Sequence, residues 1–495
     1  MISRELQRAR EYEAEYGAAI HPEQRPVFHL SPRCGWMNDP NGFGIYQGKY
    51  HMFYQYYPYA SHWDSMHWGH AVSSDLLHWE YLPCALAPDT DPDREGCFSG
   101  SAFPLPDGRH LLMYTGVSRE QQPGGQFREI QTQNIAVGDG TDYQKYEGNP
   151  VLTAADLPEG GSRFDFRDPK IFPLSDGRLC CAIGNRPADD SGQILLYLSE
   201  DGFRWKYWKV LAANRNRFGR MWECPDFFPL DGKWVLLTSP QDMLPQGFEY
   251  HNGNGTLCLT GSFDEAEGNF TEETDQAIDY GIDFYAPQTV LTPDGRRVMI
   301  GWLQNWDACA IRRPESAWAG QMSLPRELSL RNGQLCQQPL RELASLRRDE
   351  KEFHDIPVSG QVRLPGIQGR AVEMEIRVRP ADPAAVFHKF AVRFAEDGQF
   401  HTAFSFRPHE GILKADRKFS GSRRAIVHQR RCLVEHRDGA LTIRLILDRF
   451  SAECFVGEGE QVMSMALYTD TAADGISFFA DGDAVMDLKF ARLGD

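Results

Sequence analysis

The stretch NDPNGFGIYQGKYHMFYQY (38–56) decides the fold, because four later segments repeat its form. Each copy opens with a polar or acidic turn, runs through an aromatic or aliphatic pair to a Gly-containing hairpin turn, and ends in an apolar strand. The copies are FSGSAFPLPDGRHLLMYTG (98–116), RDPKIFPLSDGRLCCAIGN (167–185), ECPDFFPLDGKWVLLTSP (223–240) and DFYAPQTVLTPDGRRVMIGW (283–302). Four of the five hairpin turns are Asp-Gly, which predicts type I′ turns.

Material between these copies also repeats. SSDLLHWEYLP (73–83) and SEDGFRWKYWKVL (199–211) are near copies of one another, and the hairpin glycines recur every 55 to 69 residues. A repeat of this length made of short strands indicates a propeller or an array. Each unit holds about four strand-sized runs, so we predict five four-stranded blades around one axis.

The chain changes character after the fifth copy. Apolar residues fall at helical spacing in QPLRELASLRRDEKEF (338–353), and beyond it apolar and polar residues alternate with period two between Gly turns, a β-sandwich pattern. We therefore predict an all-β protein, a five-bladed β-propeller followed by a C-terminal β-sandwich. The expected parts are a helical extension (1–27), the propeller (28–337), a linker (338–352) and the sandwich (353–495).

Composition narrows the class of protein. A net charge of −17 argues against a nucleic-acid partner or an anionic membrane surface, and no apolar run approaches the roughly 18 residues of a membrane span. The eleven cysteines are scattered without a regular spacing, which favours reduced thiols over a disulfide framework. The charged start lacks the apolar core of a signal peptide, so we expect a cytoplasmic protein.

The five repeat heads predict where the chemistry lies. If each repeat begins with an innermost strand, the five repeat heads converge on the funnel at one end of the axis. These heads are Asp39, Ser99, Asp168, Glu223 and Asp283. Four carboxylates in one pocket would repel each other, which indicates a functional site. Carboxylates among aromatic side chains suit sugar chemistry, in which rings stack on C–H faces and carboxylates stabilise an oxocarbenium-like transition state.

Metal or cofactor chemistry finds no support in the sequence. His62, His67 and His70 lie in the aromatic-rich segment HWDSMHWGH and are expected to pack or form hydrogen bonds rather than bind zinc. No phosphate-binding loop and no GxSxG-type nucleophile turn occurs. We expect neither a metal nor a cofactor.

Six ordered motifs resemble those of glycoside hydrolase family 32, the invertases, sucrose-6-phosphate hydrolases, fructanases and related transferases. They are WMNDPNG (36–42), FSGSA (98–102), FRDP (166–169), MWECPD (221–226), DFYAPQ (283–288) and WxGxMSLPREL (318–328). The segment LDRFSAECFVGEGE (447–460) resembles part of the family's C-terminal sandwich. The resemblance implies a five-bladed propeller followed by a sandwich, in agreement with the repeats.

The resemblance also implies roles for the acids. Asp39 matches the nucleophile, Glu223 the general acid/base, and Asp168 the carboxylate that holds the fructosyl hydroxyls and stabilises the transition state. The implied reaction is hydrolysis of sucrose or sucrose 6-phosphate with retention, through a covalent fructosyl-enzyme. The implied substrate pocket consists of Trp36, Asn38, Gln55, Trp63, Phe98, Ser99, Arg167, Asp283 and Trp306.

Other readings stay open at this point. The chain could be an exo-acting hydrolase of short fructo-oligosaccharides, a fructosyltransferase, or a catalytically silent carbohydrate-binding propeller, although the last should have lost one of the three acids. Arg215, Arg217 and Arg220 lie directly before the general acid/base. They are either a solvated loop or a site for a phosphate on the leaving side of the substrate.

Overall fold

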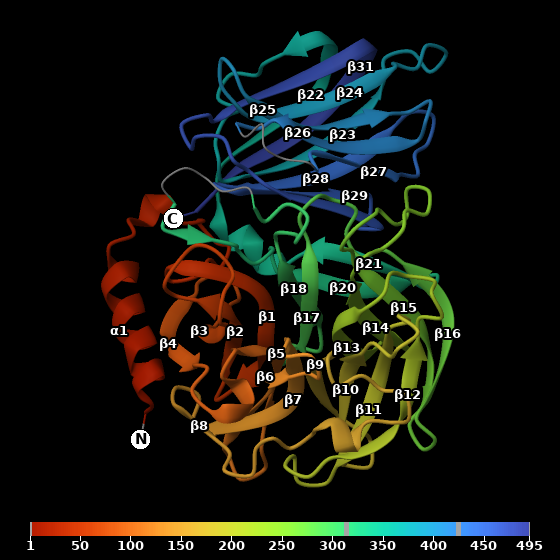
Figure 1. Cartoon of the computed structure of the whole chain (residues 1–495). Coiled ribbons are helices and arrows are strands. Elements are labelled where there is room, and N and C mark those ends of the chain that lie inside the picture. The colour runs from red at the N-terminus through yellow and green to blue at the C-terminus, as the bar shows by residue number, and fades with distance from the viewer. Residues whose placement is uncertain (1, 311–315, 422–426, 495) are drawn as a thin grey trace.

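The computed structural model describes residues 2–310, 316–421 and 427–494. Its strands form five small sheets around a common centre and one larger C-terminal sheet, which lies above them in Figure 1. The prediction of an all-β propeller followed by a sandwich is confirmed. The innermost strands β1, β5, β9, β13 and β17 gather in the middle of the propeller (Figure 1).

Each blade is an antiparallel sheet whose strands run outward in chain order. Blade I has β1 (Gly35–Tyr46), β2 (Lys49–Tyr57), β3 (His67–Ser73) and β4 (Glu80–Leu86). Blade II has β5 (Gly96–Pro104), β6 (His110–Gln121), β7 (Phe127–Gly138) and β8 (Tyr143–Lys145). Blade III has β9 (Phe166–Pro173), β10 (Leu179–Asn185), β11 (Gln193–Ser199) and β12 (Lys206–Ala213). Blade IV has β13 (Trp222–Leu230), β14 (Lys233–Pro240), β15 (Leu257–Asp264) and β16 (Asn269–Gln276). Blade V has β17 (Tyr285–Leu291), β18 (Arg297–Trp302), β20 (Arg326–Arg331) and β21 (Gln334–Pro339).

The hairpin glycines lie where the repeats place them, between the first and second strand of each blade. All five have a positive φ of 77–89°. In two hairpins, Gln47-Gly48 and Asp231-Gly232, both turn residues have positive φ, as a type I′ turn requires. In the other three, the glycine N–H donates three residues back, as Gly108 does to Leu105 O, and only the glycine has positive φ. These are type I turns followed by a left-handed glycine, so the type I′ prediction is wrong there.

The ends of the propeller meet in blade I. The short β19 (Trp318–Ala319) pairs in parallel with the start of β1, so a late segment closes the ring against the first strand. The expected N-terminal helix is α1 (Arg4–Ala18), and it packs along β4 (Figure 1). Glu13, on the buried face of α1, accepts a hydrogen bond from the backbone N–H of Cys84 at 2.7 Å.

The C-terminal strands form one ten-stranded sheet that is arranged like a sandwich around the 19-residue β31. Successive parts of β31 pair with β24 and β23, and β22 pairs along it on the other edge. These strands are β22 (Arg347–Val362), β23 (Val372–Pro380), β24 (Lys389–Glu396), β25 (His401–Arg407), β26 (Ile412–Phe419), β27 (Gln429–Leu433), β28 (Leu441–Asp448), β29 (Ser451–Val456), β30 (Gln461–Ala466) and β31 (Gly475–Leu493).

The helical signal at 338–353 is only partly realised. A 3₁₀ helix covers Arg341–Leu346, and β22 begins at Arg347. Pairing with β31 overrides the helical spacing of the later residues, because a strand partner satisfies their backbone groups.

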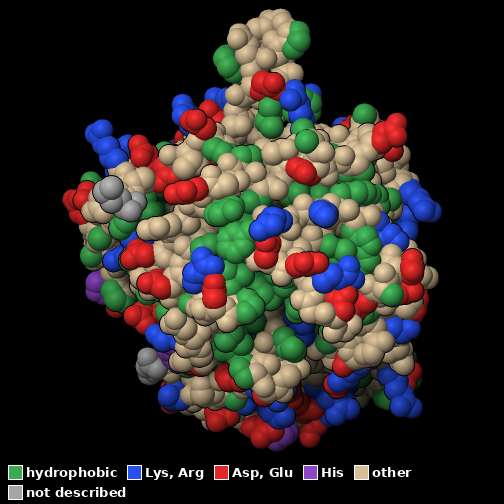
Figure 2. Space-filling view, turned by 90° about the horizontal axis from the view of Figure 1, so that it is seen from below, with side chains coloured by type: hydrophobic (Ala, Val, Ile, Leu, Met, Phe, Trp, Pro, Cys, Tyr) green, Lys and Arg blue, Asp and Glu red, His purple; other side chains and the backbone are tan. Residues whose placement is uncertain are grey.

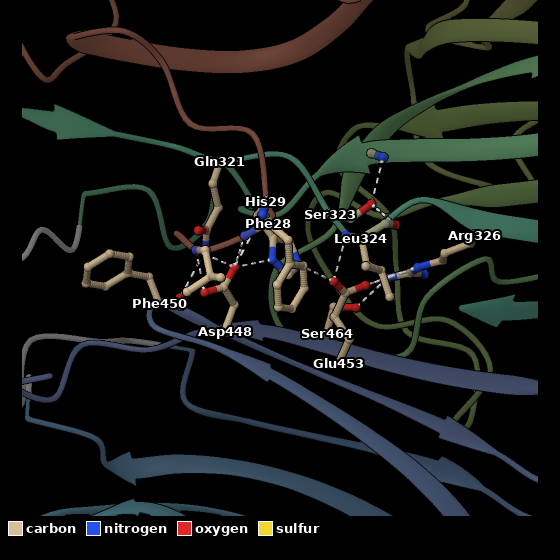
Figure 3. A network of polar contacts seen from close by, with 12 residues as sticks. Phe28, His29, Gln321, Ser323, Leu324, Arg326, Asp448, Phe450, Glu453 and Ser464 are labelled. Atoms are coloured by element: carbon tan, nitrogen blue, oxygen red, sulfur yellow. Dashed lines mark hydrogen bonds and ion pairs between the residues drawn. The ribbon is translucent and has the colours of Figure 1, made fainter. Parts of the chain in front are cut away.

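A buried network of charges joins the propeller to the C-terminal sheet (Figure 3). The two ring nitrogens of His29 lie 2.8 Å from Asp448 Oδ2 and 2.9 Å from Glu453 Oε1. Glu453 also forms an ion pair with Arg326 Nη2 at 2.6 Å, and Arg326 Nη1 forms an ion pair with Asp279 at 3.0 Å. Burial alone would lower the pKa of His29, but its hydrogen bonds to the two carboxylates outweigh burial and raise the pKa to about 9.

The outer surface carries both signs of charge. Figure 2 shows acidic and basic side chains interspersed on the face seen from below, with hydrophobic side chains between them. Within the described part of the chain, no helix has the length and apolar character needed to cross a membrane.

We predict that His29→Gln lowers the thermal unfolding midpoint at pH 6 and flattens its decline toward alkaline pH. The raised pKa means that the protonated His29 stabilises the fold fully below about pH 6.5, and that this contribution disappears as the pH rises through about 9. The measurement is the midpoint at intervals between pH 6 and 10. His354→Gln, at an exposed histidine of β22, is the control, and equal pH dependence in all three proteins would contradict the prediction.

Candidate active site

A β-bulge interrupts the innermost strand of every blade at the same point. The ladder register shifts between Met37 and Pro40, and at the equivalent places in β5, β9, β13 and β17. A bulge re-aims the side chains next to it. We compare two adjacent residues at each bulge, the two that precede the proline or, in blade II, Gly100. The first position holds Asn38, Phe98, Arg167, Glu223 and Tyr285, and the second holds Asp39, Ser99, Asp168, Cys224 and Ala286.

The second position carries backbone strain in three blades. Asp168, Cys224 and Ala286 have φ of 68°, 48° and 51°, in the left-handed region that residues with a Cβ seldom adopt. Such strain persists only where the surrounding structure imposes it, and it gathers at functional sites. A proline follows each of these three residues and fixes the next φ.

Asp39 is buried and held by only one of its oxygens. Its Oδ2 accepts a hydrogen bond from Ser99 Oγ at 2.9 Å, and Cys224 Sγ lies 3.5 Å away. Its Oδ1 is buried without a hydrogen-bond partner among the described residues. Hydrogen bonds to Oδ2 therefore fix the carboxylate, and Oδ1 is free to interact with a bound molecule.

Asp168 lies on the other side of the same thiol. Its Oδ2 accepts from the backbone N–H of Cys224 at 2.9 Å and lies 3.6 Å from Cys224 Sγ. Its own N–H donates to Thr115 Oγ1 of β6 at 2.9 Å. Two blades thus hold Asp168 in its strained conformation.

Glu223 is held at both carboxylate oxygens. Arg167 lies 2.9 Å from Oε1, and the hydroxyl of Tyr285 donates to Oε2 at 2.7 Å. Arg167 is itself held by Asp165 at 2.8 Å. Glu223 is the most accessible of the three acids, with 14% of its side chain exposed, so it can exchange protons with bound molecules.

The electrostatics follow from three acids in a buried space. Burial, and then the nearby charge of Glu223, raise the pKa of Asp39 to about 6. Burial also raises the pKa of Asp168 to about 7, with Glu223 and Asp39 adding to the shift and Arg167 opposing it. Asp39 and Asp168 therefore each cost stability when they are ionised.

Most of the expected substrate pocket surrounds these acids. Trp36 Nε1 donates to Asn38 Oδ1 at 2.7 Å, and its ring stacks on Trp306 at 6.2 Å between centroids. The choice of Trp306 over Trp302 is consistent with its partial exposure, since Trp302 is fully buried. Phe98 meets Trp63 edge to face at 5.9 Å, and 43% of Trp63 is exposed, as suits the rim of a site.

Gln55 is also buried beside this group. Its Nε2 donates to Cys97 O at 3.0 Å, one residue before Phe98. This bond ties β2 of blade I to β5 of blade II next to Ser99. Gln55 therefore sits where the first two blades meet.

Asp283 does not join the other carboxylates, and the expectation for it is not met. It lies two residues before β17, its Oδ2 pairs with Arg417, and the same oxygen accepts from the N–H of Ala466 at 2.8 Å. Both partners belong to the C-terminal sheet. Blade V instead contributes Tyr285 to the site.

The arginines before Glu223 face outward. Arg217 binds Glu272 at 2.8 Å and Asp275 at 3.2 Å, both on β16, the outermost strand of blade IV. Arg220 lies 3.7 Å from Asp190, and Arg215 is exposed. These contacts are those of a solvated loop.

The sequence did not point to several residues that shape the site, namely Tyr285, Thr115, Asp165 and Cys224. An alignment of the repeats could have identified Tyr285. Aligning the repeats on the proline after the bulge, as in NDP, RDP, ECP and YAP, places Tyr285 in register with Arg167 and Glu223. Thr115 and Asp165 are brought in by neighbouring blades and loops.

Two acids with different surroundings define the class of protein. A carboxylate with a bare oxygen next to an accessible, hydrogen-bonded carboxyl group is the pair used by glycoside hydrolases. Residues 29–339 match the N-terminal domain of the glycosyl hydrolases family 32, and residues 342–492 match its C-terminal domain. The chain belongs to glycoside hydrolase family 32, so the silent carbohydrate-binding alternative is set aside.

Individual relatives agree with this family. The chain is 37% identical to a raffinose invertase and 35% identical to a sucrose-6-phosphate hydrolase, both of Escherichia coli, with 93% of each chain covered. A β-fructofuranosidase of Bombyx mori, solved with sucrose, has a TM-score of 0.83 at 35% identity over 99% of this chain and 98% of its own. A sucrose-6-phosphate hydrolase of Lactobacillus gasseri has a TM-score of 0.83 at 26% identity, covering 98% and 96%.

We predict that Asp39→Asn raises the thermal unfolding midpoint, and more so at pH 8 than at pH 5. With a pKa raised from 3.8 to about 6, the ionised Asp39 destabilises the fold by an amount on the order of 3 kcal/mol once the pH exceeds 6. At pH 5 part of this penalty is relieved by protonation. Glu200→Gln, at an exposed carboxylate, is the control, and a lower midpoint for Asp39→Asn at both pH values would refute the prediction.

Proposed function

We propose that the protein is a retaining β-fructofuranosidase that hydrolyses the glycosidic bond of sucrose-type fructosides. The observation that carries the proposal is the contrast between the two carboxyl groups, the bare Oδ1 of Asp39 and the doubly held Glu223. The relatives named as invertases and sucrose-6-phosphate hydrolases support the substrate class.

In the first step, Asp39 Oδ1 attacks the anomeric carbon of the fructosyl group. The bond from this carbon to the glycosidic oxygen breaks, and Glu223 gives its proton to that oxygen, so glucose leaves. In the second step, a water attacks the same carbon, Glu223 takes its proton, and the bond to Asp39 breaks. Fructose is released, and both acids return to their starting states.

The surrounding residues position the sugar for this attack. Ser99 holds Asp39 Oδ2 and leaves Oδ1 directed at the substrate, which is the preorganisation a nucleophile needs. Asp168 binds fructosyl hydroxyls and stabilises the positive charge that develops on the ring. Trp36, Asn38, Gln55, Trp63, Phe98, Arg167 and Trp306 complete the fructose pocket.

The cellular location is part of the proposal. Ten of the eleven cysteines are buried with free thiols, as is usual for proteins in a reducing compartment. We place the enzyme in the cytoplasm, acting on a short imported substrate.

The direct test is product analysis with sucrose, sucrose 6-phosphate, raffinose and a short inulin series. Release of fructose from sucrose, with water as the acceptor, is expected. Fructose release from the inulin series alone would favour an exo-acting fructanase, and the build-up of longer oligosaccharides would favour a transferase. No release from any of the four would overturn the proposal.

We predict that Asp39→Asn and Glu223→Gln each lower kcat on sucrose by about 10²–10⁴-fold or more without unfolding the protein. The two variants differ in rescue. A fructoside whose leaving group needs no proton should recover much of the rate in Glu223→Gln and none in Asp39→Asn. A near wild-type rate for Asp39→Asn would refute its role as the nucleophile.

We predict that sucrose hydrolysis is unchanged after exhaustive dialysis against EDTA, because every step of the proposed reaction is carried by carboxyl groups of the chain. The measurement is kcat/KM before and after chelation, and after adding back Mg²⁺, Ca²⁺ or Zn²⁺. Loss of activity that one of these ions restores would overturn the mechanism.

A further inference from the structure

A hollow is formed where the β6–β7 hairpin meets the loop before β9 and the residue after β10. Its volume is about 590 Å³, which is within the range of small-molecule sites. Its lining comes from three separate segments, the hairpin, the loop before β9 and the end of β10. The lining residues are Arg119, Phe127, Arg128, Glu129, Phe164, Asp165 and Arg186.

Two ion pairs connect this hollow to the general acid/base. Glu223 Oε1 lies 2.9 Å from Arg167, Arg167 lies 2.8 Å from Asp165, and Asp165 lies 2.7 Å from Arg186. Asp165 and Arg186 belong to the wall of the hollow. A general acid faces the leaving group, so the hollow lies next to the leaving-group end of the substrate.

The hairpin reaches beyond the plane of the acids. Thr115 of β6 binds the backbone of Asp168, and Gln131 of β7 accepts from the backbone N–H of Phe166 at 2.8 Å. From Thr115, β6 continues for six residues to Gln121, about 20 Å at the usual rise of a strand. Four of the residues that line the hollow, Arg119, Phe127, Arg128 and Glu129, lie along this extension.

One arginine in this wall is uncommitted. The guanidinium of Arg128 stacks on the ring of Phe164 at 3.5 Å, and in the described part of the chain no carboxylate lies within 4.0 Å of it. Its cross-strand neighbour Glu120 forms an ion pair with Arg163 at 2.6 Å. A stacked guanidinium keeps the N–H groups at its edge free, and these fit a phosphate in bidentate fashion.

The other two arginines of the wall are paired with carboxylates. Arg186 binds Asp165 at 2.7 Å and lies 3.6 Å from Asp190, and Arg119 has Glu95 at 3.3 Å. Glu129 faces Arg119 across the hairpin ladder. Arg128 is therefore the arginine of this wall that has no carboxylate partner in the described part of the chain, whose full sequence has a net charge of −17.

We propose that this hollow is the subsite for the substituent on O6 of the leaving glucosyl group, and that it binds a phosphate there through Arg128, assisted by Arg119 and Arg186. The inference rests on the proposed function. Sucrose 6-phosphate and raffinose both extend sucrose at this oxygen, the first with a phosphate and the second with a neutral galactosyl group. The unpaired guanidinium of Arg128 favours the phosphate.

The test is the ratio of kcat/KM for sucrose 6-phosphate to kcat/KM for sucrose. We expect a wild-type ratio well above one, a fall of about tenfold in Arg128→Ala, and a rise of about two- to threefold in Glu129→Gln, since removing that carboxylate strengthens the positive potential. Both effects should shrink in 0.5 M NaCl. Arg215→Ala removes the same charge from the outward-facing loop and should leave the ratio unchanged.

A binding measurement separates the subsite from catalysis. Calorimetric titration of the Asp39→Asn variant with glucose 6-phosphate should show binding, and adding Arg128→Ala to this variant should weaken that binding about tenfold. Glucose should bind more weakly than glucose 6-phosphate to both proteins. Preference for raffinose over sucrose 6-phosphate, a ratio near one, or a ratio that follows Arg215 instead of Arg128 would overturn the inference. If one of these outcomes occurs and sucrose is still hydrolysed, only this inference fails and the proposed function holds. If the protein hydrolyses neither sucrose nor sucrose 6-phosphate, the proposed function itself fails.

Discussion

The arrangement of the candidate active site depends on one distortion of the backbone, the bulge that recurs in all five innermost strands. A regular strand would send alternate side chains to the two faces of its blade and none along the axis. The bulge re-aims neighbouring side chains in each blade, and in blades III, IV and V it includes a left-handed residue followed by proline. Closing the ring through β1 and β19 then brings these pairs within reach of one another.

The two positions of each bulge do different chemical work. The second position supplies the buried Asp39 and Asp168, which share contacts with the thiol of Cys224. The first supplies Arg167, Glu223 and Tyr285, which bind each other. Acids that would otherwise repel are thus separated into a buried pair with raised pKa values and an accessible acid neutralised by an arginine. The same arginine, through Asp165, forms the partition between the catalytic acids and the arginine-lined hollow.

The sequence predicts the structural elements that recur and the site residues that belong to short contiguous motifs. The blade count, the hairpin glycines and the convergence of Asp39, Asp168 and Glu223 follow from the repeats and motifs. Asp283 was misplaced because its motif begins at an acid, whereas the partner that takes it, Arg417, lies 134 residues away in the other domain. Arg215, Arg217 and Arg220 drew attention because they are adjacent, yet their partners face outward. Arg119 and Arg128 are brought together by the β6–β7 hairpin, whereas Arg186 is distant in the sequence and joins them only through the packing of blades II and III.

The charge network around His29 also constrains the order in which the chain can become stable during its synthesis. His29 leaves the ribosome early, but its partners Asp448 and Glu453 follow more than 400 residues later, and β19, which closes blade I, comes some 280 residues after β1. Blade I lacks its closing strand until residue 319 has emerged, and His29 lacks its two carboxylate partners until the last tenth of the chain has emerged. Nascent chains of this enzyme therefore depend on protection from aggregation for most of their translation, and truncation shortly before residue 448 removes the network from a propeller whose blades are otherwise complete.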